Sequence, residues 1–383
     1  MAMDLDSIPN LLEKQRDAAP DDLQHFFLEF EDFWERKLWH ELTDSLLQFY
    51  GEPQSKPQRL PLFDGFILMF ADKINQLKLV DLGIYAASQC KDDEAKLAFL
   101  KTLKGKLDKT KAQDAYVYAL VAVADKQLSL DQFDEAKKSL DESEALLDTF
   151  DYLETKIHAA FYQVNAAYNK VKNDFTAFYR NTLLHLACKD LDEISQRQCQ
   201  ITAYELSLAA LASDTIFNFG ELLLHPILES LSKTEKSWLR DLLFAFNAGD
   251  LAKYDSLAPN MSREPVLAER QDFLRLKISL SALTQTVFQR PPHDRAMTFS
   301  TISQETKVPM ESIEHLIMKA LSLGLVKGTI DQVAEVARIN WVQPKVLDMK
   351  QIEGMRLRLK EWDSSVNQLG NWIEGVGRDV WAA

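Results

Sequence analysis

Glycine and proline are scarce in this chain, at 12 residues each among 383. Because these two residue types form many tight turns, their scarcity indicates long helices joined by few turns. Apolar residues make up 46% of the chain and charged residues 27%, which is ordinary for a soluble globular protein of two or three domains. The composition therefore predicts a mostly α-helical protein with more than one domain.

Features of secreted and membrane proteins are also missing. The first residues, MAMDLDSIPN, have neither the basic nor the apolar region of a signal peptide. The longest apolar run, YVYALVAVA at 116–124, is far too short to cross a bilayer. Three cysteines, at positions 90, 188 and 199, fit a reducing compartment better than a disulfide framework. We therefore expect a soluble protein of the cytoplasm and nucleus, with no membrane partner.

The chain also lacks the motifs of enzymes and of metal sites. Its seven histidines include no H-E-x-x-H pattern, and no two cysteines have C-x-x-C spacing. There is no G-x-S-x-G motif, and GLVKGT at 324–329 lacks the glycine–lysine ending of a phosphate-binding loop. We therefore expect no catalytic residue, no cofactor and no metal ion.

A repeat of helix pairs is present instead. Phe133, Phe175 and Phe217 are separated by 42 residues each time, and a small or apolar residue follows three positions after each of them. Repeats of two helices with about this period stack on one another, because each buries its inner face on its neighbours. GEPQSKPQRLP at 51–61 is expected to interrupt the helices, because it holds three prolines. The pattern predicts a solenoid of tetratricopeptide-like repeats, with N-terminal repeats over 1–172.

Further helices are expected over 173–295, and from residue 297 the pattern becomes that of a winged helix. Ser300 can cap a short helix, and Gly324 can end the longer helix that follows. LVKGTID and VARINWV are rich in strand formers and flank QVAE, so they are predicted to form a hairpin. This order predicts a winged helix over 297–344. The buried stripe of its longer helix is expected to consist of Ile313, Leu316, Ile317, Ala320 and Leu321.

Many winged helices bind duplex DNA, but this one lacks the charge to do so. The whole chain has a net charge of −14, and residues 297–347 hold five basic and five acidic residues. Phosphate neutralisation provides most non-specific affinity for DNA, so we expect no nucleic-acid partner. A winged-helix nucleic-acid-binding protein remains the alternative from another functional class. The exposed hairpin edge can instead pair with a neighbouring protein. The residues expected at this contact are Lys327, Thr329, Asp331, Gln332, Arg338 and Asn340.

The end of the chain, 345–383, carries a heptad pattern. Two series of apolar residues begin at Ile352 and Met355, and the members of each series are seven positions apart. Such a narrow seam favours packing among other helices, whereas packing on the chain's own repeats is the alternative. The sequence therefore predicts an assembly helix. Its interface residues are expected to be Ile352, Met355, Leu359, Trp362, Val366, Leu369, Ile373 and Val376.

Helical repeats that lead into a winged helix resemble the PCI domain, a module shared by the proteasome lid, the COP9 signalosome and translation initiation factor three. TFSTISQETKVPMESIEHLIMKALSLGLVKGTIDQV at 298–333 and NFGELLLHPILESL at 218–231 closely resemble lid subunits of the 26S proteasome. The resemblance implies a PCI domain over 173–344 and a non-catalytic scaffold that acts in ubiquitin-dependent protein degradation. The implied partners are other PCI and non-ATPase lid subunits, in a hetero-oligomer, and the ubiquitin-receptor subunit is a further partner to test. A PCI subunit of the COP9 signalosome is the alternative.

Overall fold

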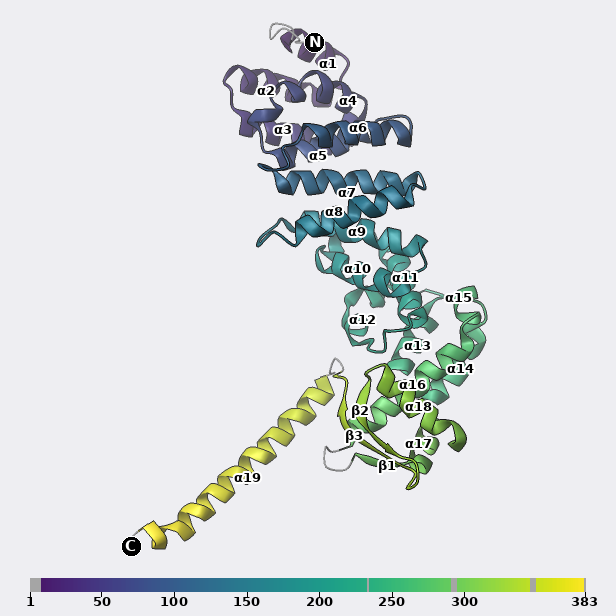
Figure 1. The fold of residues 1–383 in the computed structure, drawn as a ribbon. Helices are drawn as coiled ribbons and strands as arrows, with labels where there is room; N and C mark the ends of the chain where they lie inside the picture. The colour runs from purple at the N-terminus through teal and green to yellow at the C-terminus, as the bar shows by residue number, and fades with distance from the viewer. Residues whose placement is uncertain (1–7, 233, 291–294, 345–348, 382–383) are drawn as a thin grey trace. The chain divides into compact units, whose positions relative to one another are not determined.

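The computed structural model describes residues 8–232, 234–290, 295–344 and 349–381 (Figure 1). Most of these residues are helical, and a small antiparallel sheet lies near the carboxyl end. The chain forms two compact units, Met1–Glu193 and Ile194–Ala383. The mostly helical architecture predicted from the sequence, with repeats, a winged helix and a C-terminal helix, is confirmed.

The first unit begins with an aromatic core. The rings of Phe27, Phe30 and Phe49 lie 5.4–5.7 Å apart, edge to face, and their side chains are fully buried. Edge-to-face pairs add to the free energy that burial of the rings contributes. The prolines of residues 51–61 do not keep this segment free of helix, contrary to the prediction. Pro61 lies inside α4, where it removes one backbone hydrogen bond. The helices here are α1 (Ile8–Asp17), α2 (Gln24–Glu35), α3 (Trp39–Gly51), α4 (Lys56–Gly65) and α5 (Gln76–Ala87).

The phenylalanine repeat marks the turns between paired helices. Two residues before Phe133 and Phe175, Asp131 and Asn173 both have φ 58°, the left-handed region that ends many helices. The residue after each donates its backbone N–H to the carbonyl five positions back, at 2.9 and 3.0 Å. A turn with the same left-handed residue and the same hydrogen bond therefore joins the two helices in both pairs. The helices are α6 (Asp93–Lys106), α7 (Gln113–Ser129), α8 (Phe133–Leu147), α9 (Thr155–Val171) and α10 (Phe175–Ala187).

In the second unit the repeat becomes irregular. Phe217 precedes only a five-residue helix, and its side chain joins the core of the winged helix. The left-handed turn reappears at Gly249, φ 69°, where a Cβ atom would come within 2.6 Å of the Ala282 Cα. The helices are α11 (Gln196–Ala212), α12 (Gly220–Leu224), α13 (Ser237–Ala248), α14 (Leu251–Met261), α15 (Pro265–Ala268) and α16 (Gln271–Gln289).

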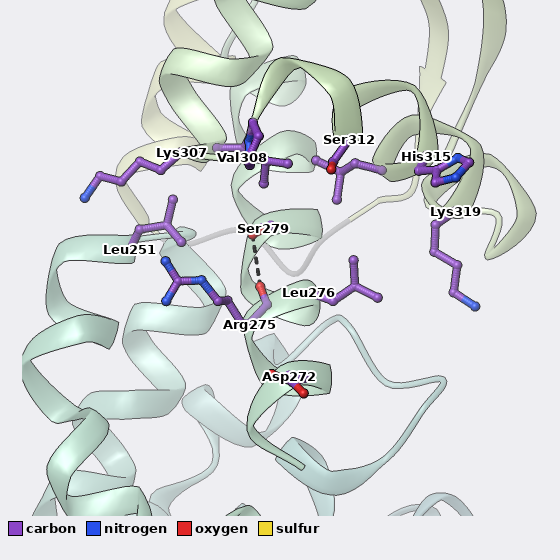
Figure 2. A pocket seen from close by; sticks show the side chains of 13 residues that line it. Leu251, Asp272, Arg275, Leu276, Ser279, Lys307, Val308, Ser312, His315 and Lys319 are labelled. Atoms are coloured by element: carbon purple, nitrogen blue, oxygen red, sulfur yellow. Dashed lines mark hydrogen bonds between the residues drawn. The ribbon is translucent and has the colours of Figure 1, made fainter.

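The winged helix packs against α16, and part of α18 faces α16 across a groove (Figure 2). Thr298, rather than the predicted Ser300, caps the short helix, because its Oγ1 accepts a hydrogen bond from the Thr301 N–H at 3.3 Å. The sheet has the order β1-β3-β2, and the sequence had not predicted β1. The elements are β1 (Ala296–Thr298), α17 (Phe299–Thr306), α18 (Met310–Ser322), β2 (Val326–Asp331) and β3 (Val336–Val342).

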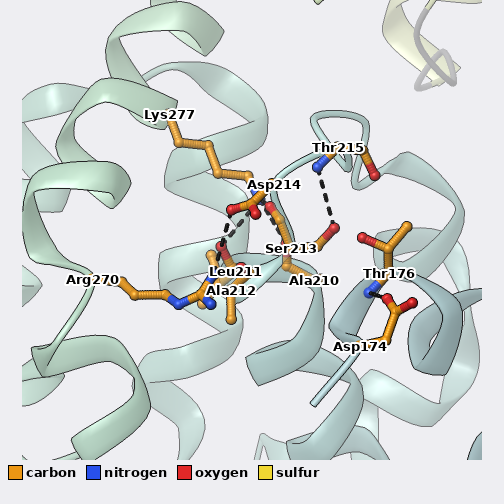
Figure 3. Close-up of polar contacts among 10 residues, drawn as sticks. All are labelled: Asp174, Thr176, Ala210, Leu211, Ala212, Ser213, Asp214, Thr215, Arg270 and Lys277. Carbon is orange, nitrogen blue, oxygen red and sulfur yellow. Dashed lines mark hydrogen bonds and ion pairs between the residues drawn. The ribbon is translucent and has the colours of Figure 1, made fainter. Parts of the chain in front are cut away.

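A buried lysine joins α16 to the end of α11 (Figure 3). Lys277 is 0% exposed, and its Nζ donates to the carbonyl oxygens of Ala210, Leu211 and Ser213 at 2.8, 3.1 and 2.6 Å. The last carbonyls of a helix have no partner within the helix and carry its negative partial charge. The ammonium group of Lys277 therefore caps α11 from the neighbouring helix. Burial lowers the pKa of Lys277 to about 7, and the Asp214 carboxylate opposes this shift.

Candidate interaction surfaces

One face of the winged-helix hairpin is exposed. On β2, an edge strand, Lys327, Thr329 and Asp331 alternate with residues that are more buried. Arg338 on β3 lies opposite Thr329 in the strand register. All six hairpin residues predicted to contact a partner are exposed. The structure thus brings Lys327, Thr329, Asp331, Arg338 and Asn340 onto the hairpin strands, and Gln332 onto the turn.

A bulge extends this surface. Lys327 pairs with Trp341 and the next residue, Gly328, pairs with Ile339, so Asn340 is the extra residue on β3. A Cβ atom on Gly328 would lie 2.2 Å from the carbonyl oxygen of Arg338, which explains the glycine here. The Lys327 Nζ lies 4.9 Å from the centre of the Trp341 ring, which is 38% exposed. Trp341 therefore belongs to the hairpin surface, although no sequence pattern predicts the bulge that exposes it.

The hairpin turn is held in place by polar contacts. Asp331 Oδ1 accepts a hydrogen bond from the Ala334 N–H at 3.0 Å, and Gln332 Nε2 donates to Glu314 of α18 at 3.0 Å. Val333, which lies between Gln332 and Ala334 in this turn, is 98% exposed. Because the turn is already held in place, burying an apolar side chain here against a partner would cost little conformational entropy.

The C-terminal helix, α19 (Met349–Trp381), presents an uncovered heptad seam. The side chains of seven predicted interface residues are between 46% and 67% exposed. These residues are Ile352, Met355, Leu359, Trp362, Val366, Leu369 and Ile373. The side chain of Val376 lies outside the described residues. Leu357 and Trp372, which lie off the seam, are also exposed. None of the described side chains of the seam is buried.

The described residues offer no site for metal chemistry. Within them, no group of three His, Cys, Asp or Glu side chains is arranged to hold a metal ion, and no helix is long and apolar enough to span a membrane. The two histidines with shifted pKa values have structural contacts. Burial lowers the pKa of both His185, whose Nδ1 lies 2.8 Å from the Ala159 carbonyl oxygen, and His225, whose Nδ1 accepts the Ile227 N–H.

Comparison with known proteins gives matches along the whole chain. Residues 26–243 match the PSD13 N-terminal repeats, 251–341 the PCI domain and 345–377 the Rpn9 C-terminal helix. The chain is 42% identical to the probable 26S proteasome regulatory subunit rpn9 of Schizosaccharomyces pombe, covering 98% of both chains. It is 39% identical to RPN9 of Saccharomyces cerevisiae, again over 98% of both. The chain belongs to the Rpn9 family. A more distant member, non-ATPase regulatory subunit 13 homolog B of Arabidopsis thaliana, is 36% identical over 97% of this chain.

Membership of the Rpn9 family confirms the main predictions from the sequence. The chain is a non-ATPase lid subunit of the 26S proteasome with a PCI domain and a C-terminal bundle helix, and it is not an enzyme. The matches favour the proteasome over the COP9 signalosome. The individual interface residues on the hairpin and on α19 remain predictions.

Hydrogen exchange can test whether α19 of this Rpn9-family chain needs partners. Gly354, Gly370 and Gly375 each weaken an isolated helix by about 1 kcal/mol, and the described side chains gain little from burial. In the isolated chain we expect the amides of 352–375 to be protected about 100-fold less than those of α16. In the assembled particle the same amides should become protected. Strong protection in the isolated monomer would contradict this prediction.

Proposed function

We propose that the chain acts as a scaffold in the lid, joining other subunits through α19 and through the hairpin of its winged helix. The observation that carries this proposal is the seam of α19, whose apolar side chains are exposed at every described position. Apolar residues repeated every seven positions favour burial among other helices, and this burial would provide much of the free energy of assembly.

The proposed partners are the other PCI and non-ATPase lid subunits, in a hetero-oligomer, and the ubiquitin-receptor subunit is a further candidate. The relatives are named as regulatory subunits of the 26S proteasome, which supports this choice. We also propose the cytoplasm and nucleus as the location. For the domains we propose N-terminal repeats over 1–172, a PCI domain over 173–344 and an assembly helix over 345–383.

Affinity purification of the tagged full-length chain, followed by mass spectrometry, tests the function directly. We expect the other lid subunits in amounts close to one copy per copy of the chain. Recovery of signalosome or initiation-factor subunits in their place would refute the assignment to the lid. Recovery of nucleic acid with no protein partner would favour the nucleic-acid-binding alternative.

The hairpin contact makes a separate prediction. The double variant Lys327→Glu, Arg338→Glu reverses two exposed charges on neighbouring strands. Rim charges contribute to orientation and to association rate, so we expect the association rate with one neighbouring PCI subunit to fall about tenfold. The rate can be measured by surface plasmon resonance with the partner subunit immobilised.

The control for the hairpin variant is the pair Lys91→Glu, Lys189→Glu, which changes the net charge equally at exposed sites in the first unit. Association rates that fall equally in both variants would show an effect of net charge alone. Such a result would remove the case for a hairpin interface.

A further inference from the structure

A groove lies between α16 and the corner where α17 meets α18, with the start of α14 at one end (Figure 2). It encloses a volume of about 770 Å³. Both apolar and charged side chains line it. The apolar part consists of Leu251, Leu276, Val308, Pro309 and Leu316.

The rim of the groove is positively charged. Lys307 and Lys319 lie at opposite ends, and Arg275 projects from α16 beside Leu251, at the Lys307 end (Figure 2). Within the described residues neither lysine forms an ion pair, whereas the Arg275 Nη1 lies 3.8 Å from Asp255 Oδ1. Asp272 is the carboxylate that lines the groove. With Asp255 counted as well, three cations face two carboxylates, which leaves a local excess of positive charge on a chain whose net charge is −14.

The backbone at Lys307 is unusual. This residue ends α17 with φ 51°, in the left-handed region that glycine occupies most readily. A side chain is disfavoured in this region because its Cβ atom comes close to the following carbonyl oxygen. A glycine would fit the turn with less strain, so the lysine brings a positive charge to the rim at a cost in stability.

The side chains of the groove argue against nucleic acid. Ser312, His315 and Lys319 form one side of α18, and this side lines the groove opposite α16. A helix that reads the major groove of DNA presents several basic or amide side chains, and of these three residues only Lys319 is basic. The exposed Glu311 and its partly buried neighbour Glu314 lie on the remaining surface of α18, where they would repel phosphate.

The polar groups inside the groove also argue against a small polar ligand. The buried hydroxyl of Ser279 donates to the Arg275 carbonyl at 2.9 Å, and that of Thr306 donates to the Ile302 carbonyl at 2.7 Å. Pockets for small molecules orient their ligand through a few converging polar groups. Here both buried hydroxyls are already bonded within their own helices, so recognition must come from apolar contact and from the cations at the rim.

We propose that this groove binds an extended acidic segment of another protein. An apolar side chain of the segment rests on Leu276 and Leu316, and its carboxylates pair with Lys307, Lys319 and Arg275. The chain's own α19 does not have this chemistry, because residues 349–381 hold five basic and five acidic residues. The groove would therefore take a partner segment distinct from the contacts of α19 and the hairpin.

The test uses the full-length chain and an array of fluorescent twelve-residue peptides, each with at least six Asp or Glu residues and one or two Leu or Phe residues at varied positions. A matched array replaces every Asp and Glu by Asn and Gln. By fluorescence anisotropy near physiological salt, we expect a subset of the acidic peptides to bind and their amide counterparts to bind at least tenfold more weakly. Absence of any acidic binder would overturn the proposal.

Variants locate the binding. We expect the double variant Lys307→Glu, Lys319→Glu to bind the tightest peptide at least tenfold more weakly. We expect the control variant Lys91→Glu, Lys189→Glu to bind this peptide as the unmodified chain does. A second variant, Lys307→Gly with Lys319→Gln, removes both charges while suiting the left-handed turn, so a loss of binding there cannot come from unfolding of α17. Equal weakening by the groove and control variants would overturn the proposal, as would tighter binding of a labelled DNA duplex that the groove variants abolish.

Discussion

Replacing Leu359 and Leu369 of α19 by aspartate is expected to exclude the chain from the assembled lid while its two compact units stay folded. Both leucines lie on the seam and are exposed in the isolated chain, so the substitutions remove no internal contact. In a helical bundle each aspartate would place a charge among apolar side chains. Two such charges cost more than about 4 kcal/mol, enough to weaken association more than about 1000-fold.

The matched control for this variant is Asn367→Asp with Asn371→Asp, which adds the same charge to α19 away from the seam. We expect this control to co-purify with the other lid subunits as the unmodified chain does. Circular dichroism and thermal unfolding check that both variants keep their helical units. If the leucine variant enters the lid normally, α19 does not provide the assembly contact.

Replacing Lys277 by methionine is expected to lower the free energy of unfolding of the second unit by at least about 3 kcal/mol, since three buried carbonyls lose their donor. Methionine has a similar volume, so the loss reports on hydrogen bonds rather than on a cavity. Urea unfolding, followed by tryptophan fluorescence and circular dichroism, measures this change. A stability within about 1 kcal/mol of the unmodified chain would show that the Lys277 cap contributes little.

The same variant tests the pKa of Lys277. This pKa is lowered from 10.5 to about 7 in the folded chain, so between these values the unfolded chain binds more protons. The advantage of lysine over methionine should therefore be smallest below pH 7. It should grow as the pH rises above 7, by up to about 1.4 kcal/mol per pH unit. A difference that does not change from pH 6 to pH 9 would show that the three carbonyls keep the ammonium group charged.

The parts of the fold that depend on local pattern could be predicted from the sequence. The hairpin was expected at LVKGTID and VARINWV, and the strands are Val326–Asp331 and Val336–Val342. Gly324 ends α18 with φ 67°, as its position suggested. Here alternation of side chains, helical periodicity and a turn-forming glycine all act over a few residues, so the sequence alone contains the information.

The parts that depend on distant contacts could not be predicted. Strand β1 has three residues, and its partner on β3 lies some forty positions later, so no local periodicity marks it. Trp341 is exposed because of a bulge that accommodates close backbone approach at Gly328. The heptad seam of α19 was visible in the sequence, but which polypeptides cover it is not determined by this chain. Lys277 lies on the buried face of α16, and only the position of α11 shows why a lysine is tolerated there.

The uncovered α19 has a consequence for the free chain in the cell. A segment with a row of exposed apolar side chains is the kind of surface that chaperones bind and that leads to aggregation. A copy without partners is thus open to capture by chaperones and to proteolysis. The amount of this chain should consequently follow the supply of the helices that cover it, so that surplus copies do not accumulate.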